Sequence, residues 1–367
     1  RTAALPRRRR RPPLPVASRR ARRYPVRRRA GARPRGSLDV SNVLQTTLAS
    51  LSLANPVLSA SGTFGSGWEG RQFSDLGHVG GLVSKTVTLL PRPGNPPPRI
   101  WETASGMLNS IGLENKGVDY FLAETLPKMK QLQAEGRQRH RHGPRLVINI
   151  GGESIADFVA LAERFCKAGV DLLEVNLSCP NVQEGKLLFS TDPRLTERAI
   201  AAVKAVANVP VFAKLSPNVT DIVAIARGAE QGGADGLTAI NTLIGMAVDW
   251  RKRKPILGRV IGGLSGPAIK PVALRMVYEL ARAVKLPIVG VGGVRSADDV
   301  LDFVCAGASA VQVGTSMFTD PGLMVRIVGE LRDKLATAGT TIGELRGALH
   351  RTGEVVPPRG CDAQGVA

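Results

Sequence analysis

Eight short apolar segments rich in β-forming residues recur along the chain, and segments of helical period separate most of them. The apolar segments are residues 56–60, 81–86, 145–150, 172–177, 211–215, 236–240, 288–291 and 310–313. The helical segments are residues 154–168, 194–207, 221–231, 271–284, 297–305 and 323–335. Strands that alternate with helices form parallel sheets, because each crossover helix returns the chain to the same edge. Eight such units predict a (β/α)8 barrel, with an open doubly wound sheet as the alternative.

The ends of the predicted helices carry the residues that cap helices. Ser154 and Gly169 flank one helix, and Ser296 and Gly307 flank another. A serine at the start accepts a hydrogen bond from a free backbone N–H, and a glycine at the end adopts the left-handed conformation there.

Four segments depart from this rhythm. Residues 88–113 contain five prolines between positions 91 and 98, which predicts an excursion over one end of the barrel. Residues 241–266 are similarly long, and we expect them to form a hairpin that roofs a ligand. Residues 131–144 are interpreted as a basic surface loop, and residues 338–367 as a short helix with a loose tail.

The net charge of +20 is concentrated at the N-terminus. Residues 1–36 hold 15 Arg, no Lys and no acid, which leaves 35 basic against 30 acidic residues elsewhere. This Arg- and Pro-rich arm has little apolar material and is expected to be disordered. A targeting peptide, a nucleic-acid-binding tail and translated upstream sequence all fit it, and the missing initiator Met favours the last. The expected domains are the arm (1–36), the barrel (37–340) and a C-terminal helix with a tail (341–367).

Composition and cysteine usage exclude several classes of protein. A hydrophobic content of 43% is enough for a full core, and no run of about 18 apolar residues predicts a membrane span. The four cysteines have no paired spacing, so we expect no disulfide framework, no metal site and no iron–sulfur cluster in this chain. A reducing compartment, the cytoplasm, is the expected location. Cys166 and Cys305 are interpreted as helix residues that pack as small hydrophobes, and Cys361 lies in the tail.

Cys179 is different, because it lies in the motif NLSCPN (residues 176–181) directly after a predicted strand. Barrel enzymes keep their chemistry at the carboxyl ends of the strands. A thiol that ionises can transfer a proton, and flanking Asn side chains offer donors and acceptors to a planar polar ligand. This placement favours acid/base catalysis on a heterocycle over a cysteine buried beside a turn.

Glycine pairs follow the last two predicted strands. Gly292 and Gly293 follow one strand, and Gly314 and Thr315 follow the next. Small residues let backbone N–H groups approach a phosphate at the corner where barrels often bind one. Together the two pairs favour a ligand that carries a phosphate.

Two lysines and several asparagines add polarity at strand ends. Lys85 and Lys214 lie in otherwise apolar segments, where an ammonium needs an anionic partner. The partner is either an anionic ligand or a carboxylate on a neighbouring strand, for which Glu174 is the candidate. Asparagines recur at strand ends and exceed what turns require: Asn109, Asn149, Asn176, Asn181 and Asn241.

A series of motifs in unbroken order from about residue 43 to 322 resembles the dihydroorotate dehydrogenase family. The motifs are SASGTFG (59–65), SKT (84–86), GNPPPR (94–99), ETASGMLNSIGLEN (102–115), NLSCPN (176–181), KLSPN (214–218), INT (240–242), GGLSGPAIKPVAL (262–274), GVGG (290–293) and VGT (313–315). The resemblance implies an FMN enzyme of pyrimidine biosynthesis that oxidises (S)-dihydroorotate to orotate.

The resemblance also implies roles for individual residues. Cys179 would remove the C5 proton while the C6 hydride passes to flavin N5, and the charge of Lys214 would stabilise the reduced anionic flavin. The residues expected to bind substrate are Lys85, Asn109, Ser110, Ile111, Gly112, Leu113, Asn176, Asn241 and Thr242. Those expected to contact FMN are Ser61, Lys85, Thr86, Asn149, Asn176, Lys214, Ile240, Gly266, Gly292, Gly293, Gly314 and Thr315.

The subclass that the resemblance implies sets the expected partners. Membrane-bound, quinone-linked members use a Ser base, so Cys179 indicates a soluble class 1 enzyme. The wording of ETASGMLNSIGLEN and GGLSGPAIKPVAL resembles the NAD-linked class 1B type most. Its catalytic subunit forms a homodimer and pairs, as a heterotetramer, with an iron–sulfur subunit that carries FAD and [2Fe-2S]. The fumarate-linked homodimer is the alternative.

One loop departs from the family pattern, and other classes remain to be separated. After NLSCPNV the chain reads QEGKLLFSTDP, with Leu187, Leu188 and Ser190 where the family has small residues, which affects how this loop closes.

The alternative enzymes are a dihydropyrimidine dehydrogenase-like domain, a dihydrouridine synthase, and a non-redox phosphate-binding aldolase or isomerase. A nucleic-acid-binding protein would depend on the arm.

Overall fold

Eight parallel strands close into a barrel in the computed structural model of the chain, which describes residues 42–140, 142–177 and 189–351. In chain order they are β3 (Val57–Ser59), β4 (Gly81–Val83), β7 (Arg145–Ile150), β8 (Leu172–Asn176), β9 (Val211–Leu215), β10 (Gly236–Ala239), β15 (Ile288–Val291) and β16 (Ala310–Val313). The barrel closes because β16 pairs with β3, with Val311 opposite Val57. All eight predicted strands are confirmed, and so is the closed barrel in place of the open sheet.

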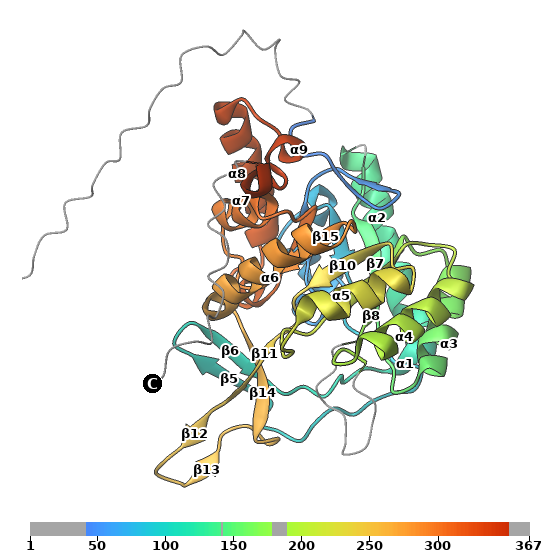
Figure 1. The fold of residues 1–367 in the computed structure, drawn as a ribbon, viewed down its shortest axis with the longest axis vertical. Coiled ribbons are helices and arrows are strands. Elements are labelled where there is room, and N and C mark those ends of the chain that lie inside the picture. Colours follow the sequence, from blue (N-terminus) through green and yellow to red (C-terminus); the bar gives the residue numbers. More distant parts are fainter. Residues whose placement is uncertain (1–41, 141, 178–188, 352–367) are drawn as a thin grey trace, which may run out of the picture. The chain divides into compact units, whose positions relative to one another are not determined.

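Helices follow the strands and cover the outside of the barrel (Figure 1). They are α1 (Gly117–Tyr120), the π-helical turn η3 (Phe121–Thr125), α2 (Leu126–His140), α3 (Ile155–Lys167), α4 (Pro193–Val206), α5 (Ile222–Gln231), α6 (Lys270–Ala283), α7 (Ala297–Cys305), α8 (Leu323–Ala338), α9 (Ile342–Leu345) and α10 (Ala348–Arg351). Short 3-10 turns are η1 (Glu69–Gln72), η2 (Leu76–His78), η4 (Pro267–Ile269) and η5 (Thr315–Phe318).

The predicted helix caps are confirmed. The Ser154 and Ser296 hydroxyls accept hydrogen bonds from the N–H groups of Asp157 and Asp299. Gly169 and Gly307 follow their helices with φ of +68° and +119°, a region that favours glycine.

The prediction of a loop over residues 131–144 is wrong for its larger part, because α2 runs from Leu126 to His140. Its buried residues Leu126, Met129, Leu132 and Gly136 recur at helical spacing on one face. Gln, Glu and Arg fill the other face, and all three are good helix formers. The high charge therefore marks a solvated helix face and not a loop.

A second sheet forms over the carboxyl ends of the barrel strands. Its order is β11 (Leu243–Met246), β14 (Ile261–Ser265), β6 (Gly106–Asn109) and β5 (Ile100–Thr103). β11 and β14 are the two arms of the predicted 241–266 hairpin, which is confirmed, and β12 (Val248–Asp249) and β13 (Lys254–Pro255) lie towards its tip (Figure 1). The antiparallel pairing of β14 with β6 joins this hairpin to the predicted proline-rich excursion.

A small hairpin lies at the opposite end of the barrel. It consists of β1 (Thr46–Leu48) and β2 (Leu51–Leu53). Leu48 and Leu53 are buried in a cluster with barrel residues such as Leu58 and Phe212. The hairpin thus closes the amino-terminal end with apolar contacts, and the opposite end remains available for a ligand. The described helices include none long and apolar enough to cross a membrane.

Candidate active site

A cavity of about 460 Å³ opens at the carboxyl ends of the barrel strands, under the four-stranded sheet. This volume is in the usual range for sites that bind small molecules. Residues from ten segments of the chain line it, among them Ser61 after β3, Lys85 after β4, and Gly292 after β15. The barrel therefore brings together groups that are far apart in the sequence.

The structure places nearly all the predicted site residues on this one cavity. The predicted residues that line it are Ser61, Lys85, Thr86, Asn109, Ser110, Ile111, Gly112, Leu113, Asn176, Lys214, Ile240, Asn241, Thr242, Gly266, Gly292, Gly293, Gly314 and Thr315. Asn149 lies behind the wall and is fully buried. Cys179, Asn181, Leu187, Leu188 and Cys361 lie outside the described residues. Ser190 is described and is buried.

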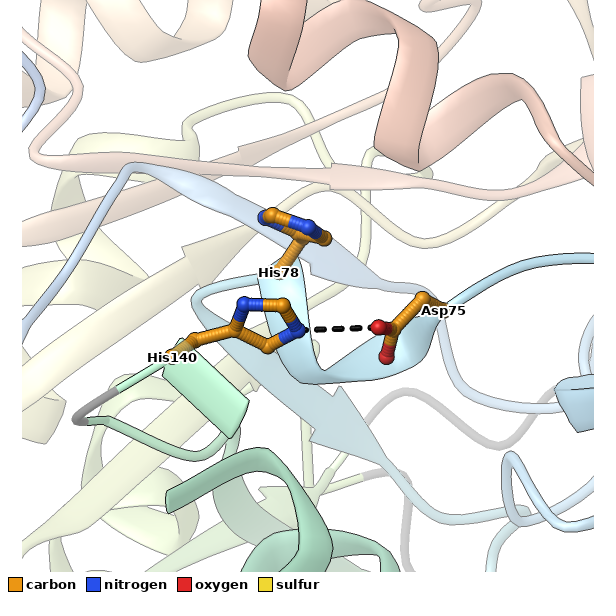
Figure 2. A group of neighbouring side chains, drawn as sticks. All are labelled: Asp75, His78 and His140. Carbon is orange, nitrogen blue, oxygen red and sulfur yellow. Dashed lines mark hydrogen bonds and ion pairs between the residues drawn. The ribbon is translucent and has the colours of Figure 1, made fainter. Parts of the chain in front are cut away.

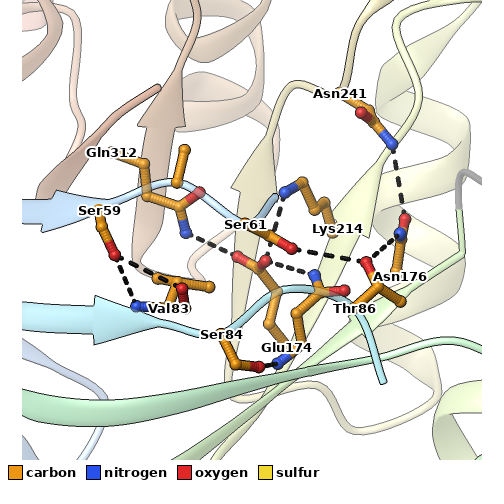
Figure 3. A network of polar contacts seen from close by, with 12 residues as sticks. Ser59, Ser61, Val83, Ser84, Thr86, Glu174, Asn176, Lys214, Asn241 and Gln312 are labelled. Carbon is orange, nitrogen blue, oxygen red and sulfur yellow. Dashed lines mark hydrogen bonds and ion pairs between the residues drawn. The ribbon is translucent and has the colours of Figure 1, made fainter. Parts of the chain in front are cut away.

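A buried polar network forms the floor of the cavity (Figure 3). Glu174 on β8 accepts hydrogen bonds from Asn149 Nδ2 at 2.6 Å and from Gln312 Nε2 at 2.7 Å. Lys214 Nζ on β9 lies 3.3 Å from Glu174 Oε1. Lys214 thus has the carboxylate partner that the sequence offered as one alternative, and it also lines the cavity.

The network keeps Glu174 ionised. Burial alone would raise the pKa of this carboxyl, but the charge of Lys214 and the hydrogen bonds from Asn149 and Gln312 outweigh it and hold the pKa below its ordinary value. A charged pair at this depth is stable only with such additional hydrogen bonds. The role of Gln312 could not be predicted from the sequence, because a single Gln in a predicted strand is usually expected to face outward.

Lys85 is placed differently from the prediction. It follows β4, which ends at Val83, so it lies past the strand and not within it. Its backbone N–H donates to Gly65 O at 3.2 Å. Its side chain forms no ion pair with a carboxylate of the described residues. Burial lowers its pKa, only partly opposed by the charge of Glu114.

Amides from two strand ends and one loop line the cavity together with Lys85 and Lys214. Asn176 Nδ2 lies 3.4 Å from Thr86 Oγ1, and Asn241 Nδ2 lies 3.5 Å from Asn176 Oδ1 (Figure 3). Asn109 ends β6 and donates to Gly263 O at 3.2 Å. Each amide contacts a neighbour, so their orientations are set before a ligand arrives.

Asn218 supports this wall from behind. Its Nδ2 donates to the carbonyl of Thr242 at 3.0 Å, and its Oδ1 accepts from the N–H of Ile244. Asn218 belongs to the motif KLSPN (214–218), but no pattern in the sequence indicated this supporting role. Other lining residues, such as Met107 and Ile261, belong to the four-stranded sheet, whose pairing no local pattern reveals.

Residues with unpaired backbone N–H groups line the part of the cavity after β15 and β16. Those of Gly292, Gly293, Gly314 and Thr315 donate to no acceptor among the described residues. Gly293 has φ of +72°, and a Cβ there would lie 2.8 Å from Lys270 Cβ and 2.9 Å from Gly266 O. A larger residue at position 293 would clash, so glycine is required there. Without a side chain, the backbone N–H remains accessible to an anion.

Comparisons with known proteins agree with this geometry. The dihydroorotate dehydrogenase family profile matches residues 43–335. The chain is 49% identical to dihydroorotate dehydrogenase B (NAD(+)), catalytic subunit, of Anoxybacillus flavithermus, over 86% of this chain and 98% of the relative. Identity to the protein of that description from Alkaliphilus metalliredigens is 47%, over 83% and 98%.

A solved structure extends the agreement to the fold. The crystal structure of DHODH in complex with ferulenol from Eimeria tenella superposes with a TM-score of 0.71 at 25% identity, covering 87% of this chain and 91% of that one. The profile, the relatives and the solved structure all indicate the same family. The chain belongs to the dihydroorotate dehydrogenase family.

Proposed function

We propose that this protein oxidises (S)-dihydroorotate to orotate, a step of UMP biosynthesis, with FMN as its cofactor. The observation that carries the proposal is the pairing, in one cavity, of a row of amides and lysines with a cradle of unpaired N–H groups. The amides suit a planar pyrimidine, and the cradle suits a phosphate.

The described residues fit FMN. The N–H groups of Gly292, Gly293, Gly314 and Thr315 would hold its phosphate. Asn149 is predicted to contact FMN, but it is fully buried, does not line the cavity and donates to Glu174 at 2.6 Å, so it acts by holding that carboxylate. Ser61, Thr86, Ile240 and Gly266 would contact the rest of the molecule. When bound, FMN supplies the two-electron acceptor for dihydroorotate.

Lys214 stabilises negative charge at the cofactor side of the cavity. The residue is 5% exposed, its ammonium is held by Glu174 at 3.3 Å, and it lines the cavity. A fixed positive charge in a site from which water is excluded stabilises developing negative charge strongly.

Lys85 binds the carboxylate of the substrate. It is the lysine of the wall without a described carboxylate partner. Asn109, Asn176 and Asn241 bind the ring amides, with Thr242 beside them. The segment from Ser110 to Leu113 closes over the substrate, and Ser110 is held there by Asn95, whose Nδ2 donates to its hydroxyl at 3.1 Å.

Cys179 is the base in this proposal. It follows Asn176 by three residues, a distance of at most about 11 Å for an extended chain, so it is within reach of the cavity. Its thiolate would take the C5 proton and the C6 hydrogen would leave as hydride, so that the C5–C6 double bond of orotate forms; FMN would supply the hydride acceptor. Because a free thiol has a pKa near 8.5, turnover is expected to rise with pH as the thiol ionises.

Electrons pass on to NAD through a partner subunit. The relatives are described as catalytic subunits of an NAD(+) enzyme, which supports this assignment. We expect a heterotetramer of two copies of this chain and two copies of an iron–sulfur subunit that bears FAD and [2Fe-2S]. Exposed apolar side chains on the four-stranded sheet and its hairpin offer a surface for association: Ile100, Trp101, Ile244, Met246, Val248, Trp250, Val260 and Ile261.

The test is dihydroorotate oxidation by the full chain, purified alone and with a co-expressed iron–sulfur flavoprotein. We expect flavin reduction by dihydroorotate in both samples and NAD reduction only in the complex. Fumarate reduction by the chain alone would favour the homodimeric type. Reduction of the flavin by a dihydropyrimidine and not by dihydroorotate would overturn the proposal.

The remaining assignments stay predictions. The cytoplasmic location fits the two unpaired cysteines, Cys166 and Cys305, of the described residues. Deleting residues 1–36 is expected to leave dihydroorotate oxidation unchanged. Loss of activity on that deletion would favour a function for the arm.

A further inference from the structure

Three of the four histidines of the chain gather at the end of the barrel opposite the cavity. His78 ends η2, just before β4, and His140 ends α2, before β7. His142 follows in the same connection. Since both connections lead into the amino ends of neighbouring strands, this cluster lies away from the carboxyl ends that form the active site.

Asp75 joins two of these histidines into a set of metal-type donors (Figure 2). His140 Nε2 lies 2.9 Å from Asp75 Oδ2. The rings of His78 and His140 have centroids 3.8 Å apart and are tilted by 37°. One nitrogen or oxygen from each of the three residues lies within 4.8 Å of the others. Small side-chain rotations would bring all three donor atoms to about 2.0–2.2 Å from a common zinc ion, the usual length of Zn–N and Zn–O bonds.

The backbone holds these donors in place. Gly77 and Gly136 let η2 and α2 approach closely, because a Cβ on Gly77 would lie 2.9 Å from Gly136 Cα. Asp75 Oδ1 accepts the N–H of Gly77 at 3.1 Å, which directs Oδ2 to His140. Asn55 Nδ2 donates to the carbonyl of His78 at 2.6 Å. The donor set therefore loses little conformational freedom when a metal binds.

Arg139 is paired with Asp75, so a metal that binds this carboxylate would displace the guanidinium. Arg139 lies 3.2 Å from Asp75 and 3.5 Å from Glu135. Its half-exposed side chain can keep Glu135 when a metal takes Asp75.

We propose that Asp75, His78 and His140 form a zinc site, with water in the fourth position. A set of two imidazoles and one carboxylate binds Zn²⁺ in preference to Mg²⁺ or Ca²⁺. The metal would link η2 to α2 and so fix the two segments that precede β4 and β7. Its role is structural, because the active-site cavity lies at the other end of the barrel.

The test is titration of the chelator-treated full chain with ZnCl₂ alone, followed by calorimetry. The Cys179→Ala background is used, because a thiolate is itself a zinc ligand. We expect one zinc per chain, and an affinity at least about tenfold weaker in His140→Gln and in His78→Gln. His142→Gln removes a neighbouring histidine that is not one of the three donors, and it is the matched control with unchanged affinity.

A second measurement keeps the proposal testable if one variant folds poorly. Cobalt bound to two imidazoles and a carboxylate in tetrahedral geometry gives intense visible absorption, which octahedral surface binding does not. His78→Gln should abolish this absorption, and no hydrogen bond of the His78 ring to a described residue is lost by it. Zinc affinity unchanged in both histidine variants, or no cobalt absorption in the parent chain, would overturn the proposal.

Discussion

Lys214 Nζ lies 3.3 Å from Glu174 Oε1, and both side chains are almost completely buried beneath the active-site cavity. Removing one member leaves the other charged without compensation. We expect Glu174→Gln to lower the free energy of unfolding by about 3–5 kcal/mol, measured by urea denaturation. The double variant Glu174→Leu, Lys214→Met should recover part of the stability, because no charge is left unpaired although Asn149 and Gln312 lose their acceptor, and it should still lack activity. A Glu174→Gln protein as stable as the parent would contradict the role of the pair.

The same pair predicts a dependence of stability on pH. The pKa of Glu174 in the folded state lies below its ordinary value of 4.5. The stabilisation is therefore complete above pH 4.5 and is lost as the pH falls through the lower, folded-state pKa. The slope of unfolding free energy against pH in this acid range should be smaller in the double variant. Equal slopes would assign the acid sensitivity to other carboxyls.

Lys85 is expected to control substrate binding and not the chemical step. A hydrogen bond to a charged group contributes about 1.5–3 kcal/mol, so Lys85→Met should raise the KM for dihydroorotate roughly ten- to a hundredfold, with a smaller change in kcat. Burial lowers the pKa of Lys85 from 10.5. As the pH rises through that lowered value the ammonium is lost, so the KM of the parent should rise and that of the variant should not.

Gly293 tests the phosphate cradle. A Cβ at this position meets Lys270 Cβ and Gly266 O, and φ is +72°. Because backbone strain of this kind costs about 1–3 kcal/mol, Gly293→Ala should weaken FMN binding roughly ten- to a hundredfold, as measured by flavin fluorescence. Gly329→Ala in α8 is the matched control, since its added Cβ meets nothing within 4 Å. Equal FMN affinities in the two variants would place the phosphate elsewhere.

Trp250 tests the association surface. It is 71% exposed at the hairpin tip, an unusual position for so large an apolar ring. We expect Trp250→Glu to weaken association with a second subunit at least tenfold by analytical ultracentrifugation. Flavin reduction by dihydroorotate should be unchanged. Undisturbed assembly in this variant would assign the interface to another face of the chain.

The barrel could be predicted from the sequence because its strands are mostly apolar and several of the helices between them begin at a capping Ser or Asp. Parallel strands such as β4 and β15 consist of apolar residues and glycine, and Ser154 and Ser296 mark helix starts. The position of α2 could not be predicted by the same signal, because much of its surface is solvated and charged.

Much of the site could also be predicted, because it lies at strand ends where the motifs are local in sequence. Lys214 shows the limit. Its type and strand position indicated an anionic partner, but only the register of β8 with β9, with Asn176 opposite Lys214, places Glu174 beside it. The pairing of β14 with β6 and the cluster of Asp75 with His140 are likewise contacts between segments far apart in sequence. No local pattern encodes them.

The most direct test is rapid anaerobic mixing of dihydroorotate with the FMN-reconstituted protein and with its Cys179→Ala variant, followed by flavin absorbance. We expect the parent flavin to be bleached, and the variant to bind the same amount of FMN but bleach at least about 100-fold more slowly. Equal bleaching rates, or a parent protein that takes up no flavin, would contradict an FMN-dependent oxidation with Cys179 as its base.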